Sequence, residues 1–216
     1  MSSVIPSPLK TWLGHRVSSK LIRRLICMKD TPRFEAIYGD FHIGKSYKSY
    51  AIGGVPNESG QIRGEIVYLL KEIRGSIKSL LLPGEKNIVK PIFSELLAIP
   101  VAAITTAGLA EEMDWHWNFE GSPPEFGKFD CIVSQAMLEH LIDPYMHMRD
   151  MENHLAPAGF LIAHSVTPGF DYHRYPVDCV RFFPDWFEEV GKRLGLVIVK
   201  KFIDRGHITY MYQKPG

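Results

Sequence analysis

A strand, a helix and a second strand follow one another between Phe129 and Phe183, and this segment constrains the fold more than any other. The apolar run from Cys131 to Val133 is typical of a buried strand, and a helical stretch follows it. A break at residues 156–159 then leads into a second apolar strand, Phe160 to Val166. Strands joined by a helix in this order pair in parallel, and parallel sheets bind ligands at the carboxyl ends of their strands. The segment therefore predicts a ligand site at one edge of an α/β sheet.

Length and composition fit one α/β domain that is specialised neither for nucleic acid nor for membranes. The chain has 216 residues, 45% of them hydrophobic, and its formal net charge of +1 gives no electrostatic reason to bind nucleic acid. The nearest approach to a membrane span, Leu96 to Ala110, is short and interrupted by proline and threonine. Three scattered cysteines without a CxxC pair indicate reduced thiols. We therefore expect a cytoplasmic protein.

The first 60 residues are expected to form a basic N-terminal extension, and residues 61–216 the α/β domain. Residues 1–29 contain six basic side chains and no acidic one. Within them, residues 9–26 can form a loosely amphipathic basic helix. Such a helix could contact the anionic surface of a membrane or a phosphorylated substrate, could dock on the core as a solvated helix, or could belong to a transit peptide. The sequence leaves these interpretations open.

The segment from Gly39 to Ser46 formally matches the phosphate-binding pattern G-x-x-x-x-G-K-[ST]. That chemistry needs a strand before the loop and a solid helix after it, so that amide groups face the phosphates. Phe34 to Tyr38 could be a short strand, but Ser46 to Ile52 allows at most two helical turns before a glycine pair. The alternative to a nucleotide site that uses Lys45 is a glycine-rich surface loop or hairpin.

The remaining elements are predicted from apolar periodicity and from glycine and proline breaks. A broad apolar face predicts one long helix from Gln61 to Leu82, which Pro83-Gly84 ends. The other predicted elements are a short strand Asn87 to Lys90, a helix Ile92 to Ala98, a strand Pro100 to Thr106, a helix Pro184 to Leu194, and a closing hairpin of Leu196 to Ile203 with His207 to Tyr212.

From Phe129 onward the chain resembles class I S-adenosylmethionine-dependent methyltransferases, in particular the type 11 group. FDCIVSQAMLEHLIDP resembles the fourth strand of that family and the loop after it, in which Glu139-His140 matches a recurrent Glu-His pair. LAPAGFLIAHSV is similar to the turn that enters strand five, and HRYPVDCVRFFPDWFEEV to a segment of members from sugar-polymer gene clusters. The resemblance implies a three-layer, mostly parallel Rossmann-like α/β sheet whose last strand is antiparallel.

This resemblance also implies that S-adenosylmethionine is the cofactor. The loop after strand one of the family aligns with NIVKPIFSELLAI, which contains Lys90-Pro91 and no glycine, so we expect a degenerate glycine-rich loop. The residues expected to hold the cofactor in an altered way are Ser134 and Gln135 after strand four, Asn118 for the adenine, Thr106 or Glu111 for the ribose, and Phe93. The alternative is a protein that has lost the cofactor and kept the fold.

The acceptor side is predicted in the loop from Thr167 to Val180. Tyr172 and His173 belong to a dense polar and aromatic cluster there, where acceptor-facing residues of this fold are expected. Glu139 and His140 follow strand four, and they either face the ligand or form a helix-entry pair bonded to backbone. Methyl transfer needs an acceptor that is held in line and, for some acceptors, deprotonated. These four residues are the catalytic candidates.

Several other polar and aromatic residues are interpreted as structural. Asp178 and Arg181 have the spacing of an ion pair that clamps the loop, and His164 inside strand five is expected to be a satisfied core group. Trp115 and Trp117 are expected to pack on the sheet edge rather than to stack on an adenine.

No metal site is predicted. His140, His147 and His154 recur every seven residues and would lie on one helical face. Neither an HExxH motif nor a close group of carboxylates accompanies them, and metal sites built on a helix normally need such partners.

The predicted activity is transfer of a methyl group from S-adenosylmethionine to a small-molecule or glycan-type acceptor. One alternative is a non-catalytic, methyltransferase-like protein that acts in binding or assembly. Another is a nucleotide-binding enzyme that uses the Gly39 to Ser46 loop.

Overall fold

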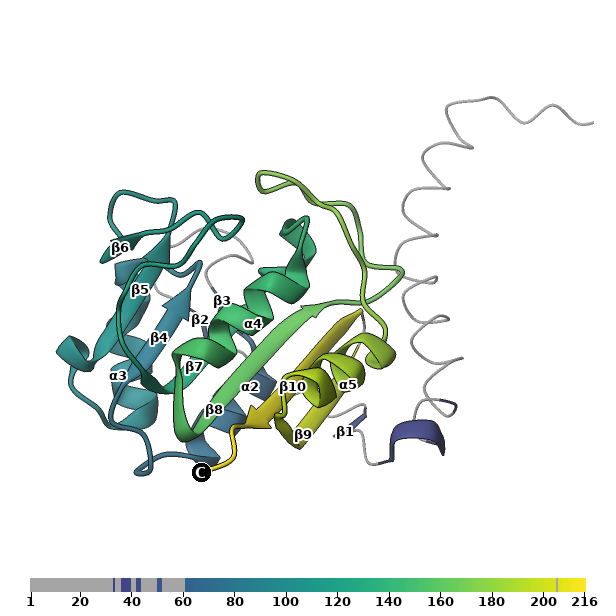
Figure 1. Cartoon of the computed structure of the whole chain (residues 1–216), viewed down its shortest axis with the longest axis horizontal. Coiled ribbons are helices and arrows are strands. Elements are labelled where there is room, and N and C mark those ends of the chain that lie inside the picture. The colour runs from purple at the N-terminus through teal and green to yellow at the C-terminus, as the bar shows by residue number, and fades with distance from the viewer. Residues whose placement is uncertain (1–32, 34–35, 40–41, 44–49, 52–60, 205) are drawn as a thin grey trace, which may run out of the picture.

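An eight-stranded sheet forms the centre of the molecule. The computed structural model describes residues 33, 36–39, 42–43, 50–51, 61–204 and 206–216. Their large sheet has the order β1-β9-β10-β8-β7-β4-β5-β6 (Figure 1). In that order, the strands are β1 (His42–Ile43), β9 (Val197–Asp204), β10 (His207–Gln213), β8 (Leu155–Val166), β7 (Phe129–Gln135), β4 (Leu80–Pro83), β5 (Ile104–Gly108) and β6 (Trp115–His116). A separate small sheet pairs β2 (Tyr50–Ala51) with β3 (Gln61–Ile62).

Helices cover both faces of this sheet and complete three layers (Figure 1). One face carries α2 (Gly64–Glu72) and α3 (Lys90–Leu97), and the other carries α4 (Pro144–His154) and α5 (Pro184–Arg193). The buried strand residues divide accordingly, since Leu81 packs with α4 and α5 whereas Leu80 and Leu82 pack with α2 and α3. Strands buried on both faces read as continuous apolar runs, as β4 does. The predicted three-layer α/β architecture is confirmed.

The prediction of one long helix from Gln61 to Leu82 is wrong. The helix α2 ends at Glu72, a turn with Gly75 at φ 93° follows, and Leu80–Pro83 form the central strand β4. Leu80, Leu81 and Leu82 fit a helical stripe as well as a fully buried strand, because periodicity cannot separate the two in a short apolar run. Because of this error, the first central strand was predicted too far toward the C-terminus.

Smaller differences concern element boundaries. Residues 87–89 form the 3₁₀ helix η2 (Asn87–Val89) instead of a strand, and β5 begins only at Ile104, after the 3₁₀ helix η3 (Val101–Ala103). The predicted break at residues 156–159 lies inside β8 as an irregularity, since Phe129 pairs with Leu155 but Cys131 pairs with Phe160. Residues 36–38 are helical, not extended.

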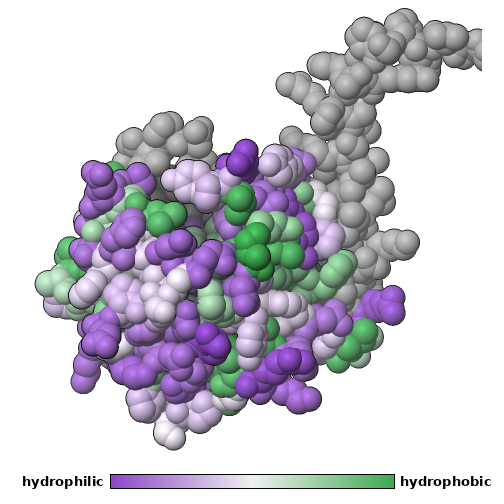
Figure 2. Space-filling view, turned by 45° about the horizontal axis from the view of Figure 1, so that its top comes forward, coloured by the Kyte–Doolittle hydropathy of each residue, from purple (hydrophilic) through white to green (hydrophobic). Residues whose placement is uncertain are grey.

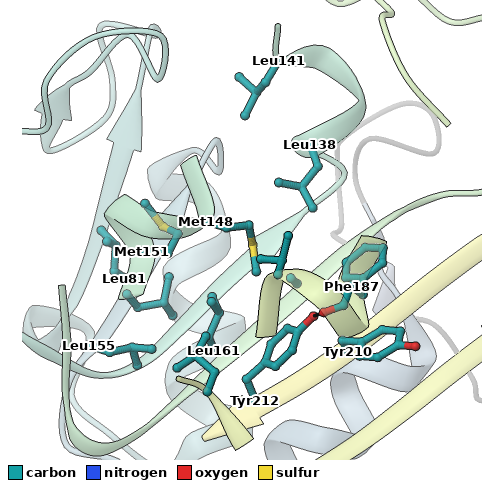
Figure 3. Close-up of a cluster of buried hydrophobic side chains, with 14 of the residues drawn as sticks. Leu81, Leu138, Leu141, Met148, Met151, Leu155, Leu161, Phe187, Tyr210 and Tyr212 are labelled. Atoms are coloured by element: carbon teal, nitrogen blue, oxygen red, sulfur yellow. Dashed lines mark hydrogen bonds between the residues drawn. The ribbon is translucent and has the colours of Figure 1, made fainter. Parts of the chain in front are cut away.

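The C-terminal predictions are confirmed. The helix α5 begins at Pro184, and β9 and β10 form an antiparallel hairpin whose second strand also pairs antiparallel with β8. Figure 3 shows how α5 is fixed to the sheet: the Tyr212 hydroxyl donates to the Phe187 carbonyl at 2.9 Å, and the Phe187 ring stacks on Tyr210 at 4.9 Å. This packing makes the β8-β10 side of the sheet a rigid support.

The order of strands reverses at β4, which lies between β5 and β7. Leu80 of β4 pairs in parallel with Ile104 of β5 and with Cys131 of β7. The chain therefore leaves β4 toward one side and later returns on the other side. In open parallel sheets, ligands bind outside the carboxyl ends of the strands at such a reversal.

Part of the predicted N-terminal extension joins the domain. His42–Ile43, in the middle of the Gly39 to Ser46 motif, form the edge strand β1 and pair in parallel with Phe202–Ile203 of β9. A phosphate-binding loop needs these residues in the loop before a helix, so the described residues of the motif do not have that conformation. Residues 9–26 and Lys45 lie outside the described residues. Among the described helices, none has the length and apolar character of a membrane span.

Candidate functional site at the carboxyl edge of the sheet

Two glycines meet at the strand reversal. Gly84 follows β4, and its amide donates to the carbonyl of Ala107 in β5 at 2.7 Å. A Cβ on Gly84, where φ is 79°, would lie 2.2 Å from Met137 Sδ, and a Cβ on Gly108 would lie 2.6 Å from Met113 Sδ. The same Cβ on Gly108 would be 3.7 Å from the Gly84 Cα, so the two glycines are neighbours. Gly84 is exposed and Gly108 is buried, and the two methionine sulfurs occupy the positions that side chains on these glycines would take; we call this stretch of backbone the glycine surface.

The position of β4 corrects the predicted position of the first central strand. The loop after β4 begins with Gly84-Glu85, and the segment with Lys90-Pro91 does not follow a strand. Lys90 lies at the start of α3, and its ammonium pairs with Asp114 Oδ2 at 2.5 Å. The loop after β4 therefore contains a glycine and an acidic residue.

Glu85 is the acidic group beside the glycines. It is partly buried, and Gln135 at the end of β7 donates from Nε2 to Glu85 Oε1 at 3.3 Å. The Gln135 side-chain oxygen accepts from the Arg63 amide at 3.1 Å, at the start of α2. Burial raises the pKa of Glu85 to about 7. A carboxyl group with a pKa near 7 is only partly ionised at neutral pH. A cationic ligand beside it would favour the ionised form, and the ionised carboxylate would in turn attract the ligand.

The predicted ribose contact Thr106 is part of the structural frame. It is buried, its hydroxyl donates to Asn87 Oδ1 at 2.6 Å, and its amide donates to Asp114 Oδ2 at 2.8 Å. The second ribose candidate, Glu111, is exposed in the loop after β5. Among the described residues, no carboxylate stands at the end of β5 itself, because that position is Gly108.

The other predicted cofactor residues have different surroundings. Ser134 is buried, and its hydroxyl lies 3.0 Å from Nε2 of the buried His147 in α4. Asn118 is exposed and accepts from the Glu120 amide at 3.2 Å. Phe93 is 1% exposed and packs in the core between α3 and the sheet. Of the predicted set, Gln135 contacts Glu85 directly after Gly84.

The predicted catalytic residues Glu139, His140 and His173 come together on the other half of the edge. Glu139 and His140 lie in the 3₁₀ helix η4 (Leu138–His140), and Glu139 Oε2 accepts from Ser165 Oγ of β8 at 2.7 Å. His173 Nε2 lies 3.8 Å from Glu139 Oε1, and the two imidazole rings meet edge to face at 4.9 Å. His140 has the backbone-bonded arrangement, because its Nδ1 donates to the Val177 carbonyl at 2.6 Å, and the ligand-facing role of Glu139 and His140 stays a prediction.

An ion pair holds the loop that carries His173. Arg181 donates twice to Asp178, at 2.5 and 2.6 Å, and Asp178 also accepts from the His173 amide at 2.7 Å. The Arg181 hydrogen bond holds the pKa of Asp178 low, at about 2. Tyr172 and Tyr175 project from this loop with 74% and 75% of their surface exposed. The structural interpretation of the ion pair is confirmed, and Tyr172 is left on the open surface.

The predicted structural role of His164 is confirmed. His164 is buried, accepts from the Ala136 amide at 3.2 Å and contacts His207 at 3.2 Å, and burial lowers its pKa well below the usual value. Of the two tryptophans expected to pack, Trp117 is buried against Phe119 at 4.6 Å, whereas Trp115 in the edge strand β6 is 43% exposed and contacts Phe126. The histidines spaced by seven residues do not share one helical face, because His140 lies in η4 while His147 and His154 lie in α4, where His147 bonds Ser134 and His154 bonds a backbone carbonyl.

A surface cavity of about 500 Å³ lies elsewhere in the molecule. Its lining includes Tyr38, Asp185 of α5, and Leu196 and Ile198 at the start of β9. Because β9 runs parallel to β8 through the shared antiparallel strand β10, Leu196 and Ile198 lie near the amino edge of the sheet, whereas Asp185 lies in the first turn of α5. The lining of the cavity does not include the glycines and histidines of the carboxyl edge.

Sequence reasoning missed Gly84, Glu85 and Gly108 as site residues. The signal that could have found them was the proline-glycine-acid sequence directly after three leucines. Read as a strand followed by a turn, it places a glycine where a parallel strand ends.

Comparison with solved structures identifies many similar folds. A S-adenosylmethionine-dependent methyltransferase from Clostridium acetobutylicum is 12% identical over 70% of this chain and 91% of its own, with a TM-score of 0.54. The [4+2]-cyclase SpnF is 13% identical over 92% of this chain and 97% of its own, with a TM-score of 0.53. A putative methyltransferase complex from Haloferax volcanii, with the Trm112 activator, matches at 12% identity over 64% and 83%, with a TM-score of 0.51. No family model matches the chain, and no curated protein matches its sequence. These likenesses concern the fold.

Proposed function

We propose, from the premise that this chain has the class I methyltransferase fold, that it binds S-adenosylmethionine at the Gly84-Gly108 surface and transfers its methyl group. The observation that carries the proposal is the pair of adjacent glycines at the strand reversal, with Glu85 beside them. A cofactor that must approach the backbone closely fits such a surface, since a Cβ at either position would occupy the space. Glu85 supplies the negative charge that a ligand with an ammonium and a sulfonium group needs.

Each group of the edge has a role in this proposal. When bound, S-adenosylmethionine supplies an electrophilic methyl group; the acceptor atom forms the new bond to carbon and loses one proton to water, and the electrons of the broken carbon–sulfur bond stay on sulfur. Gln135 orients Glu85, because it donates to Glu85 and is itself fixed by the Arg63 amide. Met113 and Met137 lie over the glycines, and their flexible thioether side chains can turn aside for a ligand.

The acceptor is proposed to be a small molecule or a glycan-type compound that enters beside the loop after β8. Tyr172 and Tyr175 are exposed on that loop, and exposed tyrosine rings offer an apolar surface with a polar end, which suits sugars and other polar small molecules. The face seen in Figure 2 mixes hydrophilic and hydrophobic side chains without one broad apolar area. Broad apolar areas mark protein and membrane contacts, so this mixed surface favours a small polar acceptor.

Equilibrium binding tests the proposal. S-adenosylhomocysteine at 100 times its dissociation constant should stabilise the native state by about 2.7 kcal/mol, which raises Tm by roughly 5–10 °C for a chain of this size. ATP with magnesium serves as the comparison ligand. Stabilisation by ATP alone would support the nucleotide alternative, and no response to S-adenosylmethionine or S-adenosylhomocysteine at millimolar concentration would contradict the proposed function.

A non-catalytic role is the second candidate, and two observations favour it. The sulfur atoms of Met113 and Met137 cover the glycines, and among the described residues no carboxylate follows β5 at the position of Gly108. Met137→Ala separates the candidates. If Met137 only rests on an open cofactor surface, its removal should leave binding of S-adenosylhomocysteine equal or tighter; if neither the native protein nor this variant binds, the non-catalytic role is preferred.

A further inference from the structure

Glu139, His140 and His173 form a cluster of metal-ligating side chains. One carboxylate oxygen of Glu139 and one ring nitrogen of each histidine all lie within 4.8 Å of one another. The three residues come from two segments, since η4 follows β7 and His173 lies in the loop after β8. Such a group can arise by chance on a surface, so further observations must indicate whether it holds an ion.

The first of these observations is the state of Glu139. Its side chain is fully buried, and Oε2 accepts from Ser165, but within the described part of the chain Oε1 has no hydrogen-bond partner. Oε1 points to the cluster, because His173 Nε2 lies 3.8 Å from it. Arg181, the cation that acts on Glu139 electrostatically, gives its hydrogen bonds to Asp178 and to backbone carbonyls. A buried carboxylate oxygen without a partner is costly, and a bound cation removes that cost.

The second observation is the way in which the two imidazoles are held. Nδ1 of His140 contacts the Val177 carbonyl at 2.6 Å, and Nδ1 of His173 contacts the Asp171 carbonyl at 3.2 Å. A carbonyl oxygen only accepts, so Nδ1 carries the proton in each ring and Nε2 keeps a lone pair in the neutral form. Asp178 Oδ2, 3.6 Å from His173 Nδ1, adds negative charge on the same side. Metal-ligating histidines are typically oriented in this way by their second nitrogen.

We propose that Glu139, His140 and His173 bind a divalent cation of the zinc class. Two imidazoles and one carboxylate suit Zn²⁺ and neighbouring transition metals, whereas Mg²⁺ and Ca²⁺ prefer oxygen ligands throughout. Ligand atoms in a tetrahedral zinc site lie about 3.4 Å apart, so binding would draw these atoms together by up to about 1.4 Å. Both histidines are partly exposed, which leaves room for a ligand from solvent in the remaining position. Three protein ligands with an open position are typical of catalytic ions.

The ion would act on the acceptor. A divalent cation lowers the pKa of a hydroxyl group bound to it and thereby makes the oxygen a better nucleophile. The acceptor would therefore carry a hydroxyl group that binds the ion, and the product would be a methyl ether. This role rests on the proposed function, whereas binding of the ion itself does not.

Titration of the full chain with Co²⁺ and Zn²⁺ tests the site. Protein dialysed against a chelator should bind one equivalent of Co²⁺ and develop the visible absorption of a nitrogen- and oxygen-ligated ion, and Zn²⁺ should displace it. His173→Ala and His140→Ala should each weaken binding at least tenfold. His154→Ala is the matched control, because that histidine bonds a helix carbonyl outside the cluster, and it should bind Co²⁺ as the native protein does.

Two results would overturn the site. Binding that is equal in all three histidine variants would make the ion adventitious. Absence of Co²⁺ uptake by the native protein would show that His173 and Glu139 form a polar contact without a metal. Circular dichroism of His173→Ala confirms that the variant is folded. S-adenosylhomocysteine is titrated into the same samples, so failure of the metal site and failure of cofactor binding are separate outcomes.

Discussion

The two halves of the carboxyl edge are built in different ways. In the β4-β5 half, Gly84 and Gly108 bring backbone close together without side chains of their own, and the side chains of Met137 and Met113 lie over them. The β7-β8 half consists of side chains that fix one another, with Glu139 bonded to Ser165 and His173 bonded to Asp178. A bare surface suits a cofactor that is bound by shape, and a fixed polar cluster suits the reacting acceptor. If this division is correct, changes in one half should leave binding in the other half intact.

The largest effect is expected from Gly84→Ala. The new Cβ would stand where Met137 Sδ lies, and it would prevent close approach of a cofactor, so the dissociation constant of S-adenosylhomocysteine should rise about a hundredfold, close to 3 kcal/mol. Gly75→Ala is the matched control, because Gly75 has a similar φ of 93° but has nothing within 4 Å of its Cβ position. Both variants should lose about 1 kcal/mol of stability from backbone strain. Equal affinities of the two variants for S-adenosylhomocysteine in calorimetric titrations would show that Gly84 is not part of the cofactor site.

Asp178→Asn should loosen the other half. This change removes the negative charge of the carboxylate to which Arg181 and the His173 amide donate. Loss of a buried, charge-assisted hydrogen bond costs about 2 kcal/mol of folding stability. The Tm should fall by roughly 4–8 °C while the affinity for S-adenosylhomocysteine stays unchanged. Glu189→Gln is the control, since its ion pair with Arg193 is exposed and should contribute little to stability. A fall in cofactor affinity in Asp178→Asn would show that the two halves are coupled.

Acid should destabilise the fold through His147, which lies beneath the edge. Burial lowers its pKa to about 3, so the unfolded chain binds a proton below pH 6.5 that the folded chain does not. Stability contributed by neutral His147 is therefore present above pH 6.5 and is lost as the pH falls toward 3, by roughly 2 kcal/mol at pH 5. The double variant Ser134→Ala, His147→Leu removes both hydrogen-bond partners, and its urea midpoint should change less between pH 7 and pH 5 than that of the native protein.

Glu85 should make cofactor affinity depend on pH. Its pKa is raised to about 7 in the folded chain, and a cationic ligand favours the ionised form, so affinity should increase as the pH rises through 7. Between pH 6 and pH 8 the ionised fraction grows about tenfold, and the affinity should rise by a similar factor. Glu85→Gln should bind more weakly at pH 8 and with little pH dependence. An unchanged pH profile in that variant would assign the dependence to another group.

The smallest effect is expected from Lys90→Ala. Lys90 pairs with Asp114 on the outer side of the β4-β5 half, and such a pair near the surface contributes about 1 kcal/mol or less. The affinity for S-adenosylhomocysteine should not change. Weaker binding in this variant would indicate that the segment with Lys90-Pro91, and not the loop with Gly84, contacts the cofactor.

The sequence was informative where local signals and strand lengths agreed. The segment after Phe129 was predicted as strand, helix and strand, and the closing hairpin was predicted with its direction, because turns and alternating residues mark those elements clearly. Leu80–Pro83 was predicted as part of a helix, because a short run of leucines fits both a helix and a buried strand. Because of that single error, the loop expected to bind the cofactor was predicted at Lys90, whereas the loop after the central strand begins at Gly84.

The site was predictable in part for a different reason. Glu139, His140 and His173 could be found because functional loops follow the carboxyl ends of strands. Their mutual distances depend on β7 and β8 lying side by side, which one sequence does not state. Ser134 and Thr106 were predicted as ligands but bond His147 and Asn87, and such buried partners can be recognised only after the chain is folded.

Hydrogen exchange with and without S-adenosylhomocysteine tests most directly whether the cofactor lies on the glycine surface. The proposed function predicts slower amide exchange in peptides that cover residues 83–86 and 107–114 when the ligand is present, because a bound molecule shields the loops after β4 and β5. Peptides of the cavity beside α5, such as residues 185–198, should not change. Protection confined to that cavity, or no protection at saturating ligand, would contradict the account.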